Sequence, residues 1–220
     1  MTESASVAFD DDSAPAGGLA TLSNPGTRRS FLRGAGLALL GTVLSPLMAQ
    51  SRGARAKPKP RFTVPVRARV KNVKVRKGRW TTLIVHHSGI RSGNATTYDR
   101  EHRRRGMENG LAYHFVIGNG VDSGDGEIEV GSRWMRQIKG GHVRSDQINE
   151  VAIGICLVGN FDQVRPTPNQ VAALKELVTY LRNEVVGSRI KFQGHREAHP
   201  GHTACPGRYF PLKEMHRLFG

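Results

Sequence analysis

Short apolar runs of strand length recur along the chain from residue 81 onward. The run Val151-Ala-Ile-Gly-Ile-Cys-Leu-Val158 is almost continuously apolar, which is typical of a strand buried on both faces at the centre of a sheet. Another run, Thr81-Thr-Leu-Ile-Val-His-His87, ends in two histidines. The apolar pattern predicts strands over residues 81–87, 112–117, 127–131, 151–158 and 189–192.

Helical periodicity is clearest between residues 167 and 184. Thr167-Pro-Asn-Gln170 combines an N-cap residue, a proline at the first helical position and a glutamine three residues after the cap. The apolar side chains that follow recur at helical spacing on one face: Val171, Leu174, Leu177, Val178 and Leu181. Shorter helices are expected over residues 97–105 and 211–218, so the pattern predicts a mixed α/β domain.

The segment over residues 57–79 has a different pattern. It begins Pro-rich, and Val64-Pro-Val-Arg-Ala-Arg-Val70 alternates between apolar and polar positions. We expect a linker that runs into an edge strand over residues 64–70. Residues 57–79 carry ten Lys or Arg and no acids, whereas residues 80–220 carry eighteen Lys or Arg and fourteen acids. Most of the net charge of +15 therefore belongs to a basic arm.

A basic arm of this kind attracts polyanions in general, and salt screens the attraction. The alternative is a solubilising tether without a partner. The more evenly charged remainder of the chain shows no zinc-finger spacing and no aromatic-basic platform. We therefore do not expect nucleic acid as a partner.

Residues 1–56 have the features of an export signal. Thr27-Arg-Arg-Ser-Phe-Leu-Arg33 precedes an apolar stretch over residues 34–47 that is too short to span a bilayer. Paired arginines followed by Phe-Leu resemble a twin-arginine signal, the address of a pathway that exports folded proteins. Cleavage is expected at Ala54-Arg-Ala56 or near Ala49, which places the mature protein in the periplasm or the extracellular cell wall. The alternative is a cytoplasmic protein with a buried apolar helix.

Histidine and cysteine gather in one Gly- and Pro-rich loop near the C-terminus. The loop contains His195, His199, His202 and Cys205. Imidazole and thiolate are the ligands that zinc prefers, and a site with three protein ligands and one open position is catalytic in type. We therefore predict a metal site here, with a merely polar loop as the alternative. Cys156 lies in a buried run instead, so we expect no disulfide.

A second source of ligands is the pair His86-His87 at the end of a predicted strand. Adjacent side chains on a strand point to opposite faces of the sheet. Only one of the two histidines is therefore expected to face a site shared with the Cys/His loop. A lone strand histidine with a structural role is the alternative.

Four blocks of sequence carry a family resemblance. They are Leu83-Ile-Val-His-His-Ser88, Ala112-Tyr-His-Phe-Val-Ile117, Ile153-Gly-Ile-Cys-Leu-Val-Gly-Asn160, and Gly194-His-Arg-Glu197 followed by Thr203-Ala-Cys-Pro-Gly207. In this order they resemble the zinc-dependent N-acetylmuramoyl-L-alanine amidases, which include phage and bacterial amidases and animal peptidoglycan recognition proteins. The resemblance implies one domain over residues 80–220, with a central mixed sheet, flanking helices and one zinc in a cleft.

The resemblance also implies a ligand set. His86, His195 and Cys205 match the three zinc ligands of the family. Tyr113 matches the tyrosine that lies over the zinc in catalytically active members. Some relatives place a proton-shuttling glutamate on the central strand, where this chain has Cys156.

Further positions are implied around these ligands. Thr203 takes the place of a lysine or threonine that assists catalysis, and His142 matches a histidine that lines the substrate cleft. The ligand loop is two residues longer than in the phage and animal members, which leaves the roles of His199 and His202 open. Glu197 is expected to be structural.

The activity implied by the resemblance is hydrolysis of the amide between N-acetylmuramic acid and L-alanine in peptidoglycan. The expected partners are peptidoglycan or muropeptides, together with anionic wall polymers at the basic arm, and the expected state is a monomer. The alternative is a protein that recognises peptidoglycan without cutting it. Non-catalytic members typically lack the cysteine ligand, which this chain retains as Cys205.

Overall fold

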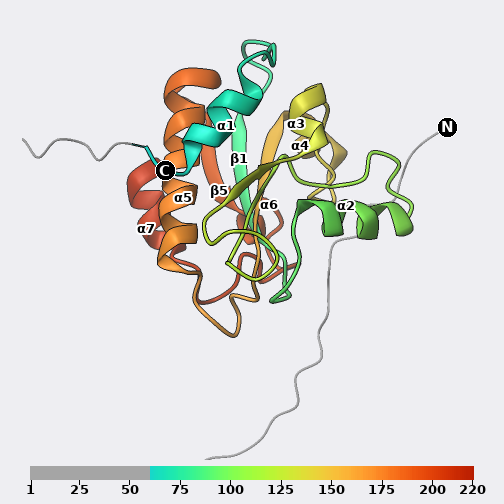
Figure 1. Cartoon of the computed structure of the whole chain (residues 1–220), viewed down its shortest axis with the longest axis vertical. Coiled ribbons are helices and arrows are strands. Elements are labelled where there is room, and N and C mark those ends of the chain that lie inside the picture. The colour runs from blue at the N-terminus through green and yellow to red at the C-terminus, as the bar shows by residue number, and fades with distance from the viewer. Residues whose placement is uncertain (1–59) are drawn as a thin grey trace, which may run out of the picture. The chain divides into compact units, whose positions relative to one another are not determined.

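The computed structural model describes residues 60–220, which form a five-stranded mixed sheet in the order β3-β2-β4-β1-β5 (Figure 1). The strands are β1 (Thr82–His87), β2 (Phe115–Ile117), β3 (Ile128–Val130), β4 (Ala152–Leu157) and β5 (Lys191–Gly194). Strand β1 pairs in parallel with β4 and β5, β2 pairs in parallel with β4, and β3 is antiparallel to β2. The predicted mixed sheet is confirmed.

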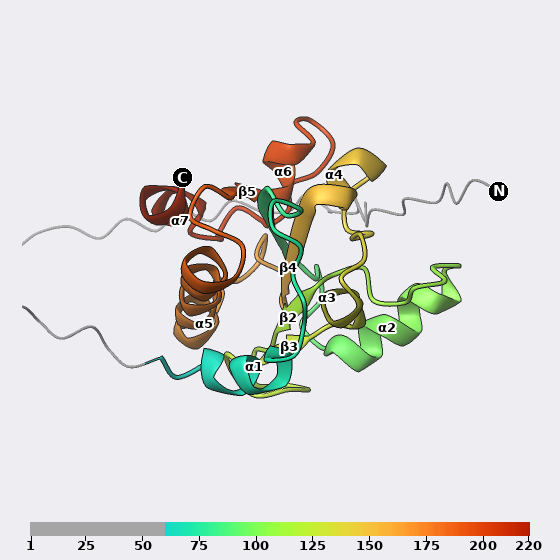
Figure 2. The ribbon, with the colours of Figure 1, turned by 90° about the horizontal axis from the view of Figure 1, so that it is seen from above.

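Strand β4 is the central strand, as its apolar run predicts. All six of its residues are buried, because helices cover both faces of the sheet. Helices α5 (Pro168–Tyr180) and α7 (Leu212–Phe219) lie on one face and α2 (Ala95–Arg104) on the other (Figure 2). The remaining helices are α3 (Ser132–Arg136), α4 (Asp146–Val151) and α6 (His195–Ala198).

Helix α5 begins as its sequence predicts. The Thr167 hydroxyl accepts from the Gln170 amide at 2.9 Å, and the Gln170 side chain accepts from the Thr167 amide at 3.1 Å. The Gln170 amide group also donates to the carbonyl oxygens of Ile117 and Val158 at 3.2 and 2.8 Å, which joins the helix to the sheet. Beyond Tyr180 the chain continues as a π-helical turn over Leu181–Val185, so the α-helix is shorter than predicted.

The strand predicted over residues 64–70 is wrong, because this segment forms helix α1 (Thr63–Val70). Its alternating pattern also fits a helix, since Val66 and Val70 are four residues apart and both are buried. The decisive interaction comes from α5. The Glu176 carboxylate accepts from the backbone amides of Arg61, Phe62 and Thr63 at 2.7 to 3.2 Å, and so caps the N-terminus of α1.

Removing this cap tests how firmly α1 is held. We expect Glu176→Ala to lower the free energy of unfolding by about 1 kcal/mol, as for other lost N-caps, in a urea titration. Glu150→Ala is the matched control, because Glu150 makes only a loose pair with Arg79 at 3.6 Å. Equal losses in the two variants would contradict a specific capping role.

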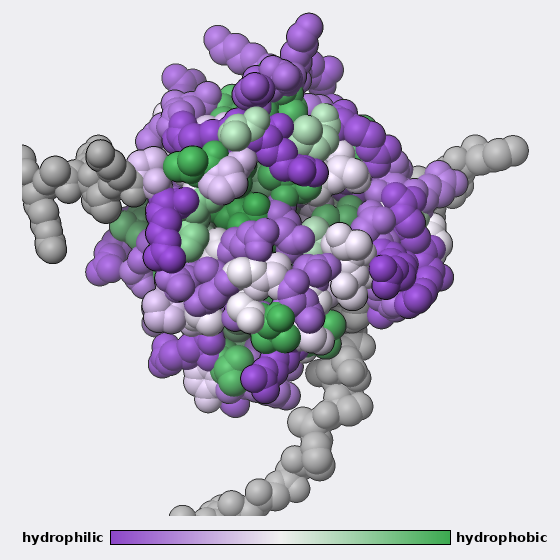
Figure 3. Space-filling view, in the orientation of Figure 1, coloured by the Kyte–Doolittle hydropathy of each residue, from purple (hydrophilic) through white to green (hydrophobic). Residues whose placement is uncertain are grey.

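Hydrophilic residues cover most of the face seen in Figure 3, and hydrophobic residues form small patches on it. Within residues 60–220, no helix combines the length and the apolar character needed to cross a membrane. The predicted signal over residues 1–56 and its cleavage sites lie outside the described residues. The division of the chain at residues 56 and 79 stays a prediction.

Candidate metal centre

Two parallel strands bring the first two candidate ligands to one edge of the sheet. Val85 of β1 is in register with Gly194 of β5. The residue after each of these two is a histidine: His86, which is still in β1, and His195, which begins α6. Since parallel strands end at the same edge, the two imidazoles come together, with ring centroids 4.5 Å apart.

The loop after α6 adds the third ligand. The donor atoms of His86, His195 and Cys205 all lie within 4.8 Å of one another, and all three residues are buried. The Cys205 Sγ lies 3.8 Å from Nδ1 of His86, close to the roughly 3.5 Å that separates two ligands of a tetrahedral zinc. Two imidazoles and a thiol are the donor set that zinc prefers, so the residues fit this metal.

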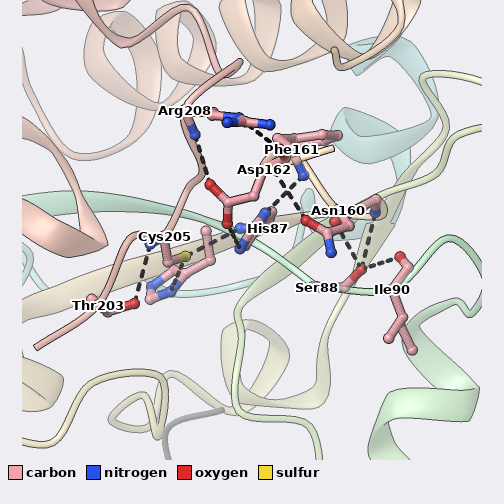
Figure 4. Close-up of polar contacts among 11 residues, drawn as sticks. His87, Ser88, Ile90, Asn160, Phe161, Asp162, Thr203, Cys205 and Arg208 are labelled. Atoms are coloured by element: carbon pink, nitrogen blue, oxygen red, sulfur yellow. Dashed lines mark hydrogen bonds and ion pairs between the residues drawn. The ribbon is translucent and has the colours of Figure 1, made fainter. Parts of the chain in front are cut away.

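Strand alternation separates His86 from His87, as the sequence predicts. The His87 Nδ1 accepts from the Phe161 amide at 3.0 Å, and its Nε2 lies 3.9 Å from the Asp162 carboxylate (Figure 4). The His87 backbone amide, however, donates to the Cys205 Sγ at 3.4 Å. His87 therefore supports the site through its backbone and not through its imidazole.

The Cys205 thiol is protonated at neutral pH when no metal is present. Burial raises its pKa to about 12, although the His87 amide counteracts part of this effect. The Cys205 backbone is fixed in turn by Thr203, whose hydroxyl accepts from the Cys205 amide at 3.1 Å (Figure 4). A metal that binds here must therefore displace the thiol proton.

Tyr113 lies beside the candidate ligands. Its ring centroid is 5.2 Å from that of His86, and it stacks on His142 at 6.3 Å. Burial, and then the neighbouring Cys156 and Cys205, raise the pKa of Tyr113 well above its ordinary value of 10. The phenol therefore stays neutral and remains a hydrogen-bond donor at neutral pH.

His142 is placed inside the protein. Only 6% of its surface is exposed, and its Nδ1 lies 3.0 Å from Nε2 of His86. Its predicted role in the substrate cleft stays a prediction. The structure thus brings Tyr113, His142, His195 and Cys205 together around His86, while Thr203 contacts the site through the Cys205 amide.

The longer ligand loop places its extra histidines differently. The His199 ring meets that of His195 edge-on at a centroid distance of 5.9 Å, whereas His202 is exposed. Neither belongs to the three-donor group. Glu197 has a structural position, because its carboxylate accepts from the Gly194 amide at 2.6 Å and bonds to His216 at 2.8 Å. The two cysteines are free, as predicted.

The sequence does not predict two residues that support the site, His102 and Asn149. His102 of α2 accepts from the Ala112 amide at 3.0 Å through Nδ1, and its ring meets Tyr113 edge-on at 5.9 Å. The Asn149 side chain accepts from the amides of His142 and Val143 at 3.1 and 3.2 Å. No motif or spacing marks either residue, because each acts across a fold-dependent contact.

Comparisons with known proteins identify the family of this chain. A family model described as N-acetylmuramoyl-L-alanine amidase matches residues 76–208, more than half of the chain. The endolysin N-acetylmuramoyl-L-alanine amidase LysCS from Clostridium intestinale is 29% identical with a TM-score of 0.54, over 64% of this chain and 84% of that structure.

Animal proteins are also similar. A Drosophila PGRP-LB variant in complex with tracheal cytotoxin is 25% identical with a TM-score of 0.50, over 66% of this chain and 85% of that structure. Peptidoglycan-recognition protein SC2 of Drosophila simulans is 33% identical over 99 residues, 44% of this chain. The match spans 47% of that relative, so the chain covers about half the length of the curated relatives it matches.

Proposed function

The chain belongs to the N-acetylmuramoyl-L-alanine amidase family, and we propose that it is a zinc-dependent enzyme that hydrolyses the amide between N-acetylmuramic acid and L-alanine in peptidoglycan. One observation carries this proposal, the convergence of two imidazoles and one thiol beside a buried tyrosine. Hydrolysis adds one water across the amide. It frees the carboxyl group on the sugar's lactyl arm and the amino group of the peptide's first alanine.

The chain's own residues have distinct tasks in this reaction. His86, His195 and Cys205 would hold the metal, which when bound supplies a Lewis acid for water and the scissile carbonyl. Negative charge develops on the carbonyl oxygen during attack. The neutral Tyr113 hydroxyl, whose ring lies beside His86, is the proposed donor to this oxygen. A single donor of this kind contributes about 10²-fold or more in rate. Thr203 keeps Cys205 in place through its backbone amide.

A second candidate function is recognition of peptidoglycan without cleavage. It is favoured by the similarity to peptidoglycan-recognition protein SC2 and to the PGRP-LB variant crystallised with tracheal cytotoxin. The complete donor set favours the enzyme, since recognition alone does not require a metal. Incubation with purified peptidoglycan distinguishes the two functions: the enzyme releases new N-terminal alanine, whereas a recognition protein binds the polymer and releases none.

The proposed partners are peptidoglycan and muropeptides, and the proposed state is a monomer. The twin-arginine-like sequence around residues 27–33 supports a periplasmic or extracellular location. A fusion of residues 1–56 to a reporter that must fold before export tests this location directly. Export that persists after both Arg28 and Arg29 are replaced by lysine would count against a twin-arginine route.

The basic segment is proposed to hold anionic wall polymers. Those of its cations that lie within residues 60–79 are found around α1 and the turn that leads into β1. His86 lies near the other end of β1, roughly 15 Å further along a strand of this length. Six exposed cations of this segment make no ion pair in the described structure: Arg61, Arg69, Lys71, Lys74, Arg76 and Lys77. Polyanion binding there would leave the metal centre accessible.

Neutralising three of these charges is expected to weaken retention on purified cell-wall sacculi at low salt. We expect Lys71→Gln, Lys74→Gln and Lys77→Gln together to reduce the bound fraction several-fold, and the difference to vanish at high salt because surface charges are screened. The matched control neutralises three exposed cations elsewhere that make no ion pair in the described structure: Arg189, Lys191 and Lys213. Equal losses in both variants would show that only net charge matters.

A further inference from the structure

His142 links the metal centre to a backbone carbonyl. Its Nε2 lies 3.3 Å from the carbonyl oxygen of Ala152, and its Nδ1 lies 3.0 Å from Nε2 of His86. A carbonyl oxygen can only accept a hydrogen bond, so Nε2 of His142 carries the proton. The Nδ1 of a neutral His142 is then an acceptor, and Nε2 of His86 must donate to it.

This chain of hydrogen bonds determines which nitrogen of His86 is available to a metal. With the proton on Nε2, the Nδ1 of His86 carries the free lone pair. Nδ1 is also the atom that lies 3.8 Å from the Cys205 Sγ.

The His142 ring occupies a fitted cradle between two glycines. A Cβ added to Gly154 of β4 would lie 2.6 Å from Cγ of His142, and one added to Gly140 would lie 2.5 Å from its Cδ2. Neither glycine has a positive φ, so the backbone at these positions does not require glycine. The space that a side chain would fill is taken by the ring, while Asn149 fixes the backbone of His142 at 3.1 Å.

We propose that His142 is a positioning residue, which holds His86 in the Nε2-protonated tautomer and directs its Nδ1 at the metal. In many metal sites a carboxylate or a carbonyl accepts a hydrogen bond from the metal-bound histidine and so fixes its tautomer and orientation. Here a second histidine would have this role. The proposal rests on the metal centre of the proposed function, and does not depend on amide hydrolysis. It also gives a reason for the burial of His142, of which 6% is exposed.

Zinc affinity, measured by competition with a chelator, tests this role. We expect His142→Phe, which keeps an aromatic ring in place of the imidazole but loses both nitrogens, to weaken zinc binding by about 10- to 100-fold. His102→Phe is the matched control, because His102 is as buried as His142 and bonds to the Ala112 amide and to no candidate ligand. The control is expected to lose stability and to keep its zinc affinity within about threefold.

Gly154→Ala tests the cradle without replacing a histidine. The added methyl should displace the His142 ring and weaken zinc binding to a similar degree. In a His142→Ala background the same methyl meets an empty space, so it should have no further effect on zinc affinity. Independent, additive effects of the two substitutions would contradict the cradle.

The tautomer of His86 gives a readout that does not involve activity. In zinc-free protein, long-range ¹H–¹⁵N NMR should show His86 protonated at Nε2, and His142→Phe should populate the Nδ1-protonated form. His86 protonated at Nδ1 in the parent, or zinc affinity unchanged in His142→Phe, would overturn the proposal. An absence of amidase activity alongside the expected tautomer and affinities would refute the proposed function and leave His142 as a positioning residue.

Discussion

Replacing Cys205 by serine is expected to remove zinc from the protein and to abolish amide hydrolysis. The parent should hold about one zinc per chain, as a three-ligand site requires, and the variant close to none after dialysis. Activity should fall by about 10³-fold or more, because the Lewis acid is lost with the metal. Elemental analysis and an assay for newly released N-terminal alanine measure the two effects.

Cys205 also makes the zinc affinity of the site depend on pH. Burial keeps the pKa of the Cys205 thiol at about 12, so the thiol is protonated below this pH and zinc must displace its proton. His86 adds no proton, because burial and the neighbouring His195 lower its pKa well below 6.5. The Cys205 proton alone should therefore make the apparent zinc affinity rise by about tenfold per pH unit across the neutral range.

The second cysteine provides the control for both measurements. Cys156 is fully buried in β4 and lies outside the three-donor group. Cys156→Ala should keep about one zinc per chain and the same pH dependence of affinity. A variant of Cys205 that retains zinc, or a Cys156 variant that loses it, would show that the ligand set is wrong.

Replacing Tyr113 by phenylalanine is expected to lower kcat by about 10²-fold or more and to leave the zinc content unchanged. The substitution removes only the hydroxyl, while the ring can keep its stacking on His142. Burial keeps the pKa of this phenol well above 10, so it donates throughout the neutral and mildly alkaline range. If the pH–rate profile falls at mildly alkaline pH, the ionisation of Tyr113 should therefore not be the cause.

Tyr98→Phe is the matched control for this prediction. Tyr98 belongs to the same buried cluster as Tyr113, but its hydroxyl donates to the Ser92 carbonyl at 2.8 Å. Its loss should cost about 1 kcal/mol of stability and change kcat little. Equal losses of kcat in the two variants would indicate that Tyr113 acts through packing and not through its hydroxyl.

The parts of the fold that the sequence predicts are those whose signals are local. The apolar run of β4 identifies a central strand, and the residues from Thr167 to Gln170 identify the start of α5. Helix α1 depends instead on Glu176, more than 110 residues away in sequence. Its own pattern fits both a strand and a helix, so tertiary interactions distinguish them: the cap from Glu176 and the burial of Val66 and Val70 in the core.

The metal centre likewise has parts that the sequence predicts and parts that it does not. Residue chemistry and strand alternation predict a metal site shared by the Cys/His loop and one of His86 and His87. The resemblance selects His86, His195 and Cys205 as the ligands and adds Tyr113, and these residues lie together in the structure. The hydrogen bond from His86 to His142 joins residues 56 positions apart, and no spacing rule predicts it. It arises because the loop before α4 seats its histidine between Gly140 and Gly154.

One measurement tests the central claim most directly, the release of new N-terminal alanine from purified peptidoglycan by the zinc-loaded protein. The proposed function predicts that free alanine amino groups accumulate while insoluble peptidoglycan is lost. It predicts no release of alanine amino groups after a chelator has removed the zinc. Binding of the polymer by fully zinc-loaded protein, with no release over many hours, would contradict the enzyme and favour recognition without cleavage.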